Sequence, residues 1–276
     1  MTDSLETRSL DRAITVLEVL AREQRCSLHQ LHQNTALPKS TLRRLLGTLT
    51  KRNLVRVGIN DGLFRPNIAL PWSKDRAYAA QIGRVVEVSL PHMVDLTRRI
   101  EWPSDLHVYN AGRMQIVEST YSLSPYRIGK RSEVDTKVNL FASAAGLAYL
   151  SLLDDKQVIA LARSKPRHPV WSFERVGISE ETLLQELAEI RKAGFAFRRR
   201  GFNTRAAEQP FNGMAAAVRD RSGAVGALTL FWPKRYMEPD AFAKVHATAL
   251  RAAADAISAD LTNLDRERIG RRAVAR

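Results

Sequence analysis

Basic and hydroxyl side chains dominate the segment that begins at Pro38. No acidic residue occurs between Leu37 and Ile59, whereas lysines and arginines recur there. Cationic groups of this kind neutralise phosphates, and hydroxyl groups at an exposed helix start can reach phosphate oxygens or base edges. The chemistry that these residue types could perform is therefore recognition of a polyanion. The side chains expected to contact it are Ser27, Lys39, Ser40, Thr41, Arg43, Arg44, Thr48 and Arg65.

The sequence around this segment predicts two helices that would position those side chains. Four leucines are spaced i, i+3, i+4 and i+7, which predicts a helix with one buried stripe and a basic remaining surface; they are Leu42, Leu45, Leu46 and Leu49. Ser27 and Gln30 have capping-box spacing, so a preceding helix is expected to start at Ser27. Pro38 suits the first turn of the second helix, and the chain is expected to turn just before it.

A further helix and a hairpin complete the pattern. Apolar residues recur with helical spacing from Leu10 to Ala21, and residues 54–57 and 63–65 alternate on either side of the turn-prone residues 58–62. This order is that of a winged helix-turn-helix, which places one helix in the DNA major groove. The competing interpretation is a helical hairpin with a solvated cationic face. Agreement of caps, turn and wing in one order favours DNA binding.

Composition limits the class of protein. A chain of 276 residues with 45% hydrophobic and 26% charged residues is typical of a soluble protein with two domains. Its formal net charge of +14 favours anionic partners. No run approaches the ~20 apolar residues that span a bilayer, and the polar, acid-bearing amino terminus is unlike a secretory signal. We therefore expect a cytoplasmic protein with no membrane partner.

The single cysteine and the scattered histidines offer little chemistry. Cys26 excludes an intramolecular disulfide framework. Its place before a helix start allows a thiol of lowered pKa, but a small, half-buried boundary residue is the favoured interpretation. His29 and His32 share a helix face without a third ligand nearby in sequence, and are expected on the DNA-proximal surface or in polar contacts. We expect no metal and no cofactor.

The rest of the chain predicts helices packed on an antiparallel sheet, which is an α+β domain. A long helix is expected over 77–100, kinked or restarted at Pro91, followed by a hairpin with strands 106–109 and 114–117. Further helices are expected within 141–153 and over 154–162, 180–193 and 238–261, with strands at 214–218 and 225–231. The expected organisation is a DNA-binding domain (1–71), a linker helix (72–100), a second domain (101–264) and a basic tail (265–276).

Three segments together resemble the IclR family of bacterial transcriptional regulators. Residues 36–46, which include Arg44, are close to the family's recognition-helix pattern. Residues 129–131 and 138–150 resemble its glycine and small-residue loop and helix, and residues 193–231 resemble its closing strands. Residues 102–105 and 129–131 are most similar to MhpR-type activators of aromatic-acid catabolism. The chain departs from the family pattern at Asn53, in place of a common glycine, and at residues 64–67 after the wing.

The resemblance implies a GAF-like effector-binding domain, a small organic acid effector and dimers or tetramers, with RNA polymerase as a further candidate partner. The effector-binding residues that it implies are Arg127, Val138, Ala144, Ala145, Asn203, Gly213, Thr229 and Phe231. Arg127 could pair bidentately with a carboxylate, or it could be a solvated loop residue; the sequence does not separate these interpretations. Trp102 could stack on an aromatic ring, although a core tryptophan is favoured.

The leading hypothesis is a ligand-responsive DNA-binding regulator that senses a small, aromatic carboxylic acid and controls a catabolic operon. A GAF-like-domain enzyme is the alternative from a different class. It is disfavoured because such chemistry uses cysteine pairs, and because the sequence contains no GxSxG, P-loop or HExxH motif. A ligand-independent architectural DNA-binding protein is a third hypothesis, but it leaves most of the chain without a role.

Overall fold

A computed structural model describes residues 7–68, 76–126, 133–164, 169–199 and 210–274. The chain divides into two compact units, Met1–Glu87 and Val88–Arg276. Within the described ranges, no helix has the length and apolar character needed to span a bilayer.

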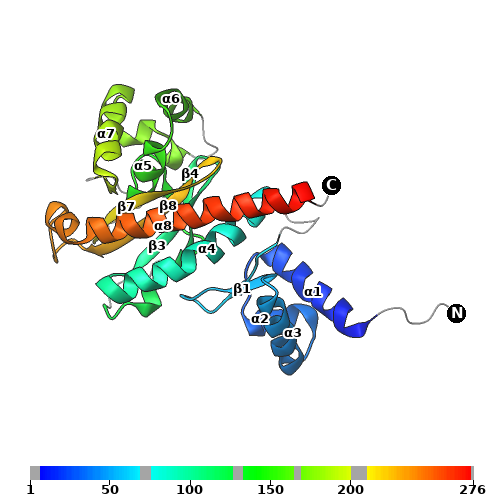
Figure 1. Ribbon diagram of the computed structural model, residues 1–276. Helices are drawn as coiled ribbons and strands as arrows, with labels where there is room; N and C mark the ends of the chain where they lie inside the picture. Colours follow the sequence, from blue (N-terminus) through cyan, green and yellow to red (C-terminus); the bar gives the residue numbers. More distant parts are fainter. Residues whose placement is uncertain (1–6, 69–75, 127–132, 165–168, 200–209, 275–276) are drawn as a thin grey trace. The chain divides into compact units, whose positions relative to one another are not determined.

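In its described residues, the N-terminal unit contains three complete helices, a short hairpin and the start of helix α4, Arg76–Ile100 (Figure 1). Its elements are α1 (Arg8–Glu23), α2 (Leu28–Thr35), α3 (Lys39–Lys51), β1 (Val55–Val57) and β2 (Phe64–Pro66). The strands are antiparallel, with Val55 opposite Pro66. Between α2 and α3, Ala36 adopts the left-handed conformation with φ of 54°, which turns the chain, and Pro38 forms the N-cap of α3. The predicted winged helix-turn-helix order is confirmed.

Leucine side chains hold these helices together. Leu42, Leu46 and Leu49 are buried, whereas Leu45 is half-buried and packs against the same cluster. Burial of each such side chain stabilises the folded state by about 1.5–3 kcal/mol. The apolar stripe of α1 is buried from Val16 onward but continues into solvent at its first turns, where Leu10 is 60% exposed.

Helix α4 (Arg76–Ile100) crosses the boundary between the two units. It continues through Pro91 as one helix, without a break at that residue. Near its end, Thr97 joins a buried hydroxyl network in the C-terminal unit: its Oγ1 lies 2.7 Å from Thr120 Oγ1, which lies 3.0 Å from Ser104 Oγ. This network attaches the last turn of α4 to the sheet.

A six-stranded antiparallel sheet forms the centre of the C-terminal unit, in the order β5-β4-β3-β8-β7-β6. Its strands are β3 (Ser104–Asn110), β4 (Arg113–Ser119), β5 (Lys137–Asn139), β6 (Ala196–Phe197), β7 (Phe211–Asp220) and β8 (Gly223–Pro233). The predicted strands are present, but the sequence did not indicate the short outer strands β5 and β6. Strands of two or three residues carry too little alternation to be recognised.

Helices cover both faces of this sheet (Figure 1). The helices are α5 (Ala144–Ser151), α6 (Asp155–Arg163), α7 (Glu180–Ala193) and α8 (Pro239–Val274), with 3₁₀ turns at Tyr121–Leu123, Pro169–Trp171 and Glu174–Val176. Helix α5 packs over β7 and β8 on one face, together with α6 and α7, whereas α8 packs on the other. Helix α8 extends thirteen residues beyond the predicted end at Leu261. The α+β fold is confirmed.

Candidate DNA-binding surface and effector site

Helix α3 presents its basic side chains to solvent. Lys39, Ser40, Arg43, Arg44 and Thr48 are exposed. No described residue pairs with the charged groups of Lys39, Arg43 or Arg44, and no acidic residue lies on α3. The predicted cationic face is therefore present, with the first turn of α3 at one end of it. Thr41 is half-buried beside this face.

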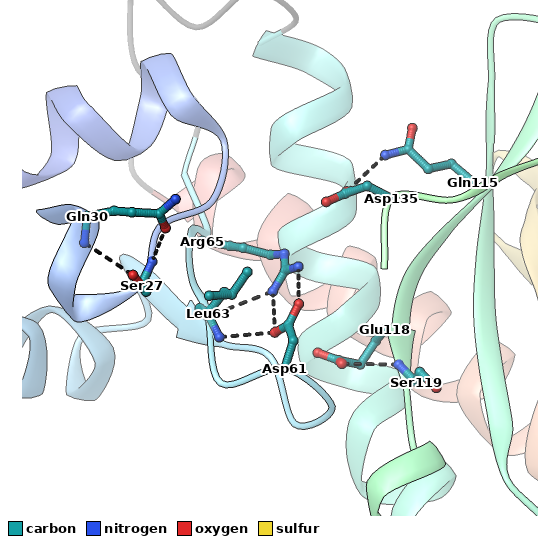
Figure 2. Close-up of polar contacts among 9 residues, drawn as sticks. All are labelled: Ser27, Gln30, Asp61, Leu63, Arg65, Gln115, Glu118, Ser119 and Asp135. Atoms are coloured by element: carbon teal, nitrogen blue, oxygen red, sulfur yellow. Dashed lines mark hydrogen bonds and ion pairs between the residues drawn. The ribbon is translucent and has the colours of Figure 1, made fainter. Parts of the chain in front are cut away.

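Ser27 has a structural task at the start of α2. Its Oγ accepts a hydrogen bond from the Gln30 amide at 3.1 Å, and Gln30 Oε1 accepts one from the Ser27 amide at 2.8 Å (Figure 2). The predicted capping box is confirmed. Because this bond engages the Ser27 hydroxyl, a contact from Ser27 to DNA would have to share it or replace it.

Arg65 was expected to neutralise a phosphate, but its guanidinium is engaged within the wing. Its Nη1 and Nη2 donate to the two Asp61 carboxylate oxygens at 3.0 and 2.6 Å (Figure 2). Asp61 Oδ1 also accepts a hydrogen bond from the Leu63 amide at 3.0 Å. The side chain of Arg65 is only 4% exposed. This geometry gives Arg65 the role of stabilising the wing turn, with its guanidinium turned to Asp61 rather than to solvent.

Cys26 and His32 are parts of the scaffold. Cys26 is buried and forms an isolated β-bridge with Phe64; burial raises the pKa of its thiol, and the Glu23 carboxylate raises it further. Cys26 lies at an element boundary, as the favoured interpretation predicts, but it is buried rather than half-buried. His32 Nδ1 lies 2.8 Å from the Leu37 carbonyl oxygen, whereas His29 is exposed. Among the described residues there is no cluster of three potential metal ligands.

Most of the expected effector-binding residues that the structure describes gather where α5 covers the sheet. Gly213 and Phe231 are paired across β7 and β8, and a Cβ placed on Gly213 would lie 3.9 Å from Ala144 Cβ. Ala145 is buried on α5, and Thr229 is two residues before Phe231 on the same face. Val138, on β5, packs half-buried at the edge of the same apolar cluster. Arg127 and Asn203 lie outside the described residues.

The strand register adds polar residues that the sequence did not single out. Thr229 lies opposite Asp105, and Asp105 lies opposite Ser119. All three are buried, as is His107, whose Nδ1 lies 3.2 Å from the Thr229 hydroxyl. Burial lowers the pKa of His107 to about 4, so its imidazole is neutral near pH 7. Period-two alternation along residues 105–107 could have placed Asp105 and His107 on one face, but it could not identify the neighbouring strands.

A cavity lies at the β6 edge of the sheet. Its volume is about 520 Å³, and it is lined by residues from α7, β6, β7 and the start of α8. Gly213, one of the expected effector-binding residues, is among the lining residues, and so is Arg198.

Trp102 is part of the core. It is 3% exposed and stacks on Tyr126 with ring centroids 4.4 Å apart, and its other ring neighbours are Tyr236 and Phe242. The favoured interpretation of Trp102 as a core residue is confirmed.

The chain matches two models of one protein family. Residues 9–57 match the IclR helix-turn-helix domain, and residues 78–259 match the C-terminal domain of the bacterial transcriptional regulator IclR. Among curated proteins, the transcriptional repressor IclR of Escherichia coli K12 is 24% identical over 200 residues, which cover 70% of this chain and 69% of that protein.

Solved structures show the same fold. The IclR protein of Thermotoga maritima aligns with a TM-score of 0.53 and 17% identity, covering 93% of this chain and 99% of its own. An IclR homologue from Microbacterium hydrocarbonoxydans, solved with 4-hydroxybenzoate, aligns with a TM-score of 0.50 and 22% identity, covering 92% and 98%. The two family models together span both units of the chain, and the protein therefore belongs to the IclR family of bacterial transcriptional regulators, which bind DNA.

Proposed function

We propose that this regulator responds to a small aromatic carboxylic acid and controls a catabolic operon. The observation that carries the proposal is the pairing of two features in one chain: the exposed cationic face of α3 and the small-residue site between α5 and the sheet. The first suits an operator, and the second leaves space for a small ligand.

The DNA-binding part of the proposal assigns roles along α3. Lys39, Arg43 and Arg44 neutralise phosphates, while Ser40, Thr41 and Arg43 reach base edges from the first turns. Thr48 lies further along the same helix, where its hydroxyl donates to the Arg44 carbonyl oxygen at 3.2 Å. Two copies of α3 in a homodimer, or in a tetramer of two dimers, would read a pseudo-palindromic operator in the cytoplasm, with RNA polymerase as a further partner.

The effector part rests on the residues around Gly213. Ala144 and Ala145 have small side chains, Gly213 has none, and Phe231 adds an aromatic wall. Support for an aromatic acid comes from the resemblance to MhpR-type regulators and from the homologue solved with 4-hydroxybenzoate, which shares 22% identity. Effector binding would shift the population between two arrangements of the winged helices, one of which fits the operator.

A two-stage measurement tests this proposal. The purified protein is first screened by thermal shift against small carboxylic and phenolic acids, and each stabilising compound is then added to a binding assay with DNA from upstream of its own coding region. A compound that stabilises the protein and changes its DNA affinity supports the sensor proposal. Tight DNA binding without any stabilising compound favours the architectural alternative, and turnover of a compound favours the enzyme. Absence of DNA binding refutes the assigned role of α3.

A further inference from the structure

Asn53 ends the recognition helix α3 in a backbone conformation that favours glycine. Its φ is 54°, in the left-handed region, which asparagine tolerates better than most residues that have a side chain. The Leu54 amide donates to the Leu49 carbonyl oxygen at 2.9 Å, so the chain closes the last turn of α3 at this point. A glycine, which the family pattern commonly has here, would satisfy the same backbone.

The side chain of Asn53 adds a contact that glycine cannot make. Its Nδ2 donates a hydrogen bond to Glu87 Oε1 at 2.8 Å. Glu87 lies on α4, in the part of that helix that belongs to the N-terminal unit. Because the acceptor is a charged carboxylate, this bond is stronger than one between neutral groups, although both side chains are exposed to water. It joins the end of the recognition helix to α4.

A second contact holds α4 against the same region, one helical turn earlier. A Cβ placed on Gly83 would lie 2.5 Å from the Asn67 carbonyl oxygen, so α4 approaches the chain that leaves the wing more closely than a side chain would allow. The Asn67 amide donates to the Leu54 carbonyl oxygen at 2.9 Å, next to Asn53. Gly83 and Glu87 are four residues apart and share one face of α4. That face is fixed to the base of the wing and to the end of α3.

The later part of α4 is fixed to the C-terminal unit. His92 Nε2 lies 2.8 Å from Asp260 Oδ2 on α8, and Thr97 Oγ1 lies 2.7 Å from Thr120 Oγ1. The helix is continuous from Glu87 to these contacts. One helix therefore has contacts within both units, and the bond from Asn53 to Glu87 is its contact with the recognition helix.

We infer that Asn53 is a positioning residue for operator binding: through Glu87 it fixes α3 on α4, so that the two copies of α3 in a dimer keep the separation that paired half-sites require. This inference rests on the proposed function, in which a dimer reads a pseudo-palindromic operator. Asn53 contacts no DNA in this role. Loss of its bond leaves each α3 able to enter the major groove but loosens the placement of the two copies.

Exchange of the donor and the acceptor tests this role in the full-length protein. Asn53→Gly removes the amide and suits the left-handed backbone. Asn53→Asp keeps the shape but places a carboxylate against Glu87. The double variant Asn53→Asp/Glu87→Gln reverses the hydrogen bond and keeps the net charge of the pair. Asn34→Asp is the control, because Asn34 is exposed on α2 and its side chain donates within that helix, to the Gln30 carbonyl oxygen at 2.9 Å.

Fluorescence anisotropy measures the affinity of each variant for two duplexes of equal length from upstream of the coding region. One contains the footprinted operator with both half-sites, and the other contains one half-site. The ratio of the two affinities reports the placement of the two helices, since general attraction to DNA acts equally on both duplexes.

Asn53→Gly and Asn53→Asp should lower this ratio by about three- to tenfold, because each of the two copies loses one exposed hydrogen bond. The affinity of Asn53→Gly for one half-site should not change. The double variant should restore the ratio to within about twofold of that of the unmodified protein, and Asn34→Asp should leave the ratio unchanged.

Three other results would contradict the inference. If Asn53→Gly and Asn53→Asp keep the full ratio, the role of Asn53 is refuted and the proposed function stands. If the affinities for both duplexes fall together and the double variant does not restore them, Asn53 supports the fold of the N-terminal unit and does not position α3 on α4. If the unmodified protein binds one half-site as tightly as two, the reading of a paired operator by a dimer fails, and the inference fails with it.

Discussion

At the residue scale, the role of Arg44 separates DNA binding from ligand sensing. Arg44 is exposed on α3 and no described residue pairs with it. Arg44→Ala should weaken operator binding by about tenfold or more and lower the salt dependence of log K by roughly one unit, because one phosphate contact is lost. Effector binding should be unchanged, since the helix keeps a favourable residue there.

Fluorescence anisotropy at several salt concentrations measures the Arg44 effect. Arg22→Ala is the control, because Arg22 is exposed on α1 and forms an ion pair with Glu23 at 2.9 Å rather than lying on the α3 face. Loss of both DNA and effector binding in the Arg44 variant would mean that the variant is misfolded or that the division of tasks between the two units is wrong.

Arg65 provides the complementary case, in which an arginine of the wing acts on stability. Arg65→Gln leaves Asp61 without its bidentate partner, so it should lower the free energy of unfolding by about 1–3 kcal/mol, as breaking partly buried hydrogen-bonded charges does. The salt dependence of DNA binding should not change. Chemical denaturation measures the stability, and titration with salt measures the salt dependence of DNA binding. If the variant has unchanged stability and a reduced salt dependence, Arg65 contacts a phosphate as the sequence predicts.

His107 should make stability depend on pH. Its pKa is about 4 in the folded protein, against 6.5 for an ordinary histidine, so the unfolded chain binds the proton more readily. The stability that the neutral imidazole contributes is present above pH 6.5 and declines as the pH falls towards 4, by roughly 3 kcal/mol in total. Denaturant titrations at pH 7 and pH 5 should show this decline for the unmodified protein and a smaller one for His107→Gln. Equal declines would place the responsible group elsewhere.

At the element scale, α5 depends on a close approach that only glycine permits. A Cβ on Gly146 would clash with the backbone carbonyl of Leu140, and backbone cannot move aside as a flexible side chain can. Gly146→Ala should therefore destabilise the C-terminal unit by several kcal/mol and remove effector binding. Gly47→Ala is the matched control: Gly47 is on α3 with nothing near its Cβ position, and alanine there should stabilise the helix by about 0.5–1 kcal/mol.

Thermal unfolding of the two glycine variants decides this prediction. The Gly146 variant should show an earlier transition for the C-terminal unit, whereas the Gly47 variant should unfold at or above the temperature of the unmodified protein. A Gly146→Ala protein with unchanged stability and ligand binding would show that the loop before α5 can shift at little cost.

Elements with strong local signals could be predicted from the sequence, and those that depend on long-range pairing could not. The Ser27 capping box and the leucine stripe of α3 are encoded within a few residues. The assignment of Gly213 and Thr229 to the effector site comes from the family resemblance and stays a prediction. The sequence could not indicate that His107 lies beside Thr229, because this neighbourhood depends on the pairing of β3 with β8.

Arg65 is a residue whose charge the sequence shows but whose partner it does not. Its residue type and its place after the wing turn suggested a phosphate contact, whereas the structure pairs it with Asp61, four residues earlier. The charge of a side chain can be read from the sequence, but whether that charge is already satisfied depends on the turn that brings Asp61 back to it.

At the scale of the whole molecule, a net charge of +14 provides general attraction to DNA but does not specify a site. One α3 helix presents only a few groups that can read bases, so specificity requires two copies of it. If a dimer holds its two winged units at a fixed separation on the same side of the duplex, the affinity for an operator depends on the spacing between the two half-sites as well as on their base sequence.

Insertions between the half-sites test that arrangement. Five added base pairs rotate one half-site by about half a turn of the duplex, so one α3 can no longer enter the major groove of its half-site. The affinity for DNA should then fall by about a hundredfold or more. Ten added base pairs restore the rotational phase and should recover part of the lost affinity. Footprinting locates the half-sites, and ultracentrifugation of the complex gives the number of copies bound. If five base pairs have no effect, the two recognition helices are not held in fixed phase, and an effector could not act by changing their relative placement.

If the phase effect is present, adding the acid that binds the C-terminal unit should change the affinity for the natural spacing more than for an isolated half-site, because only the paired site depends on that placement.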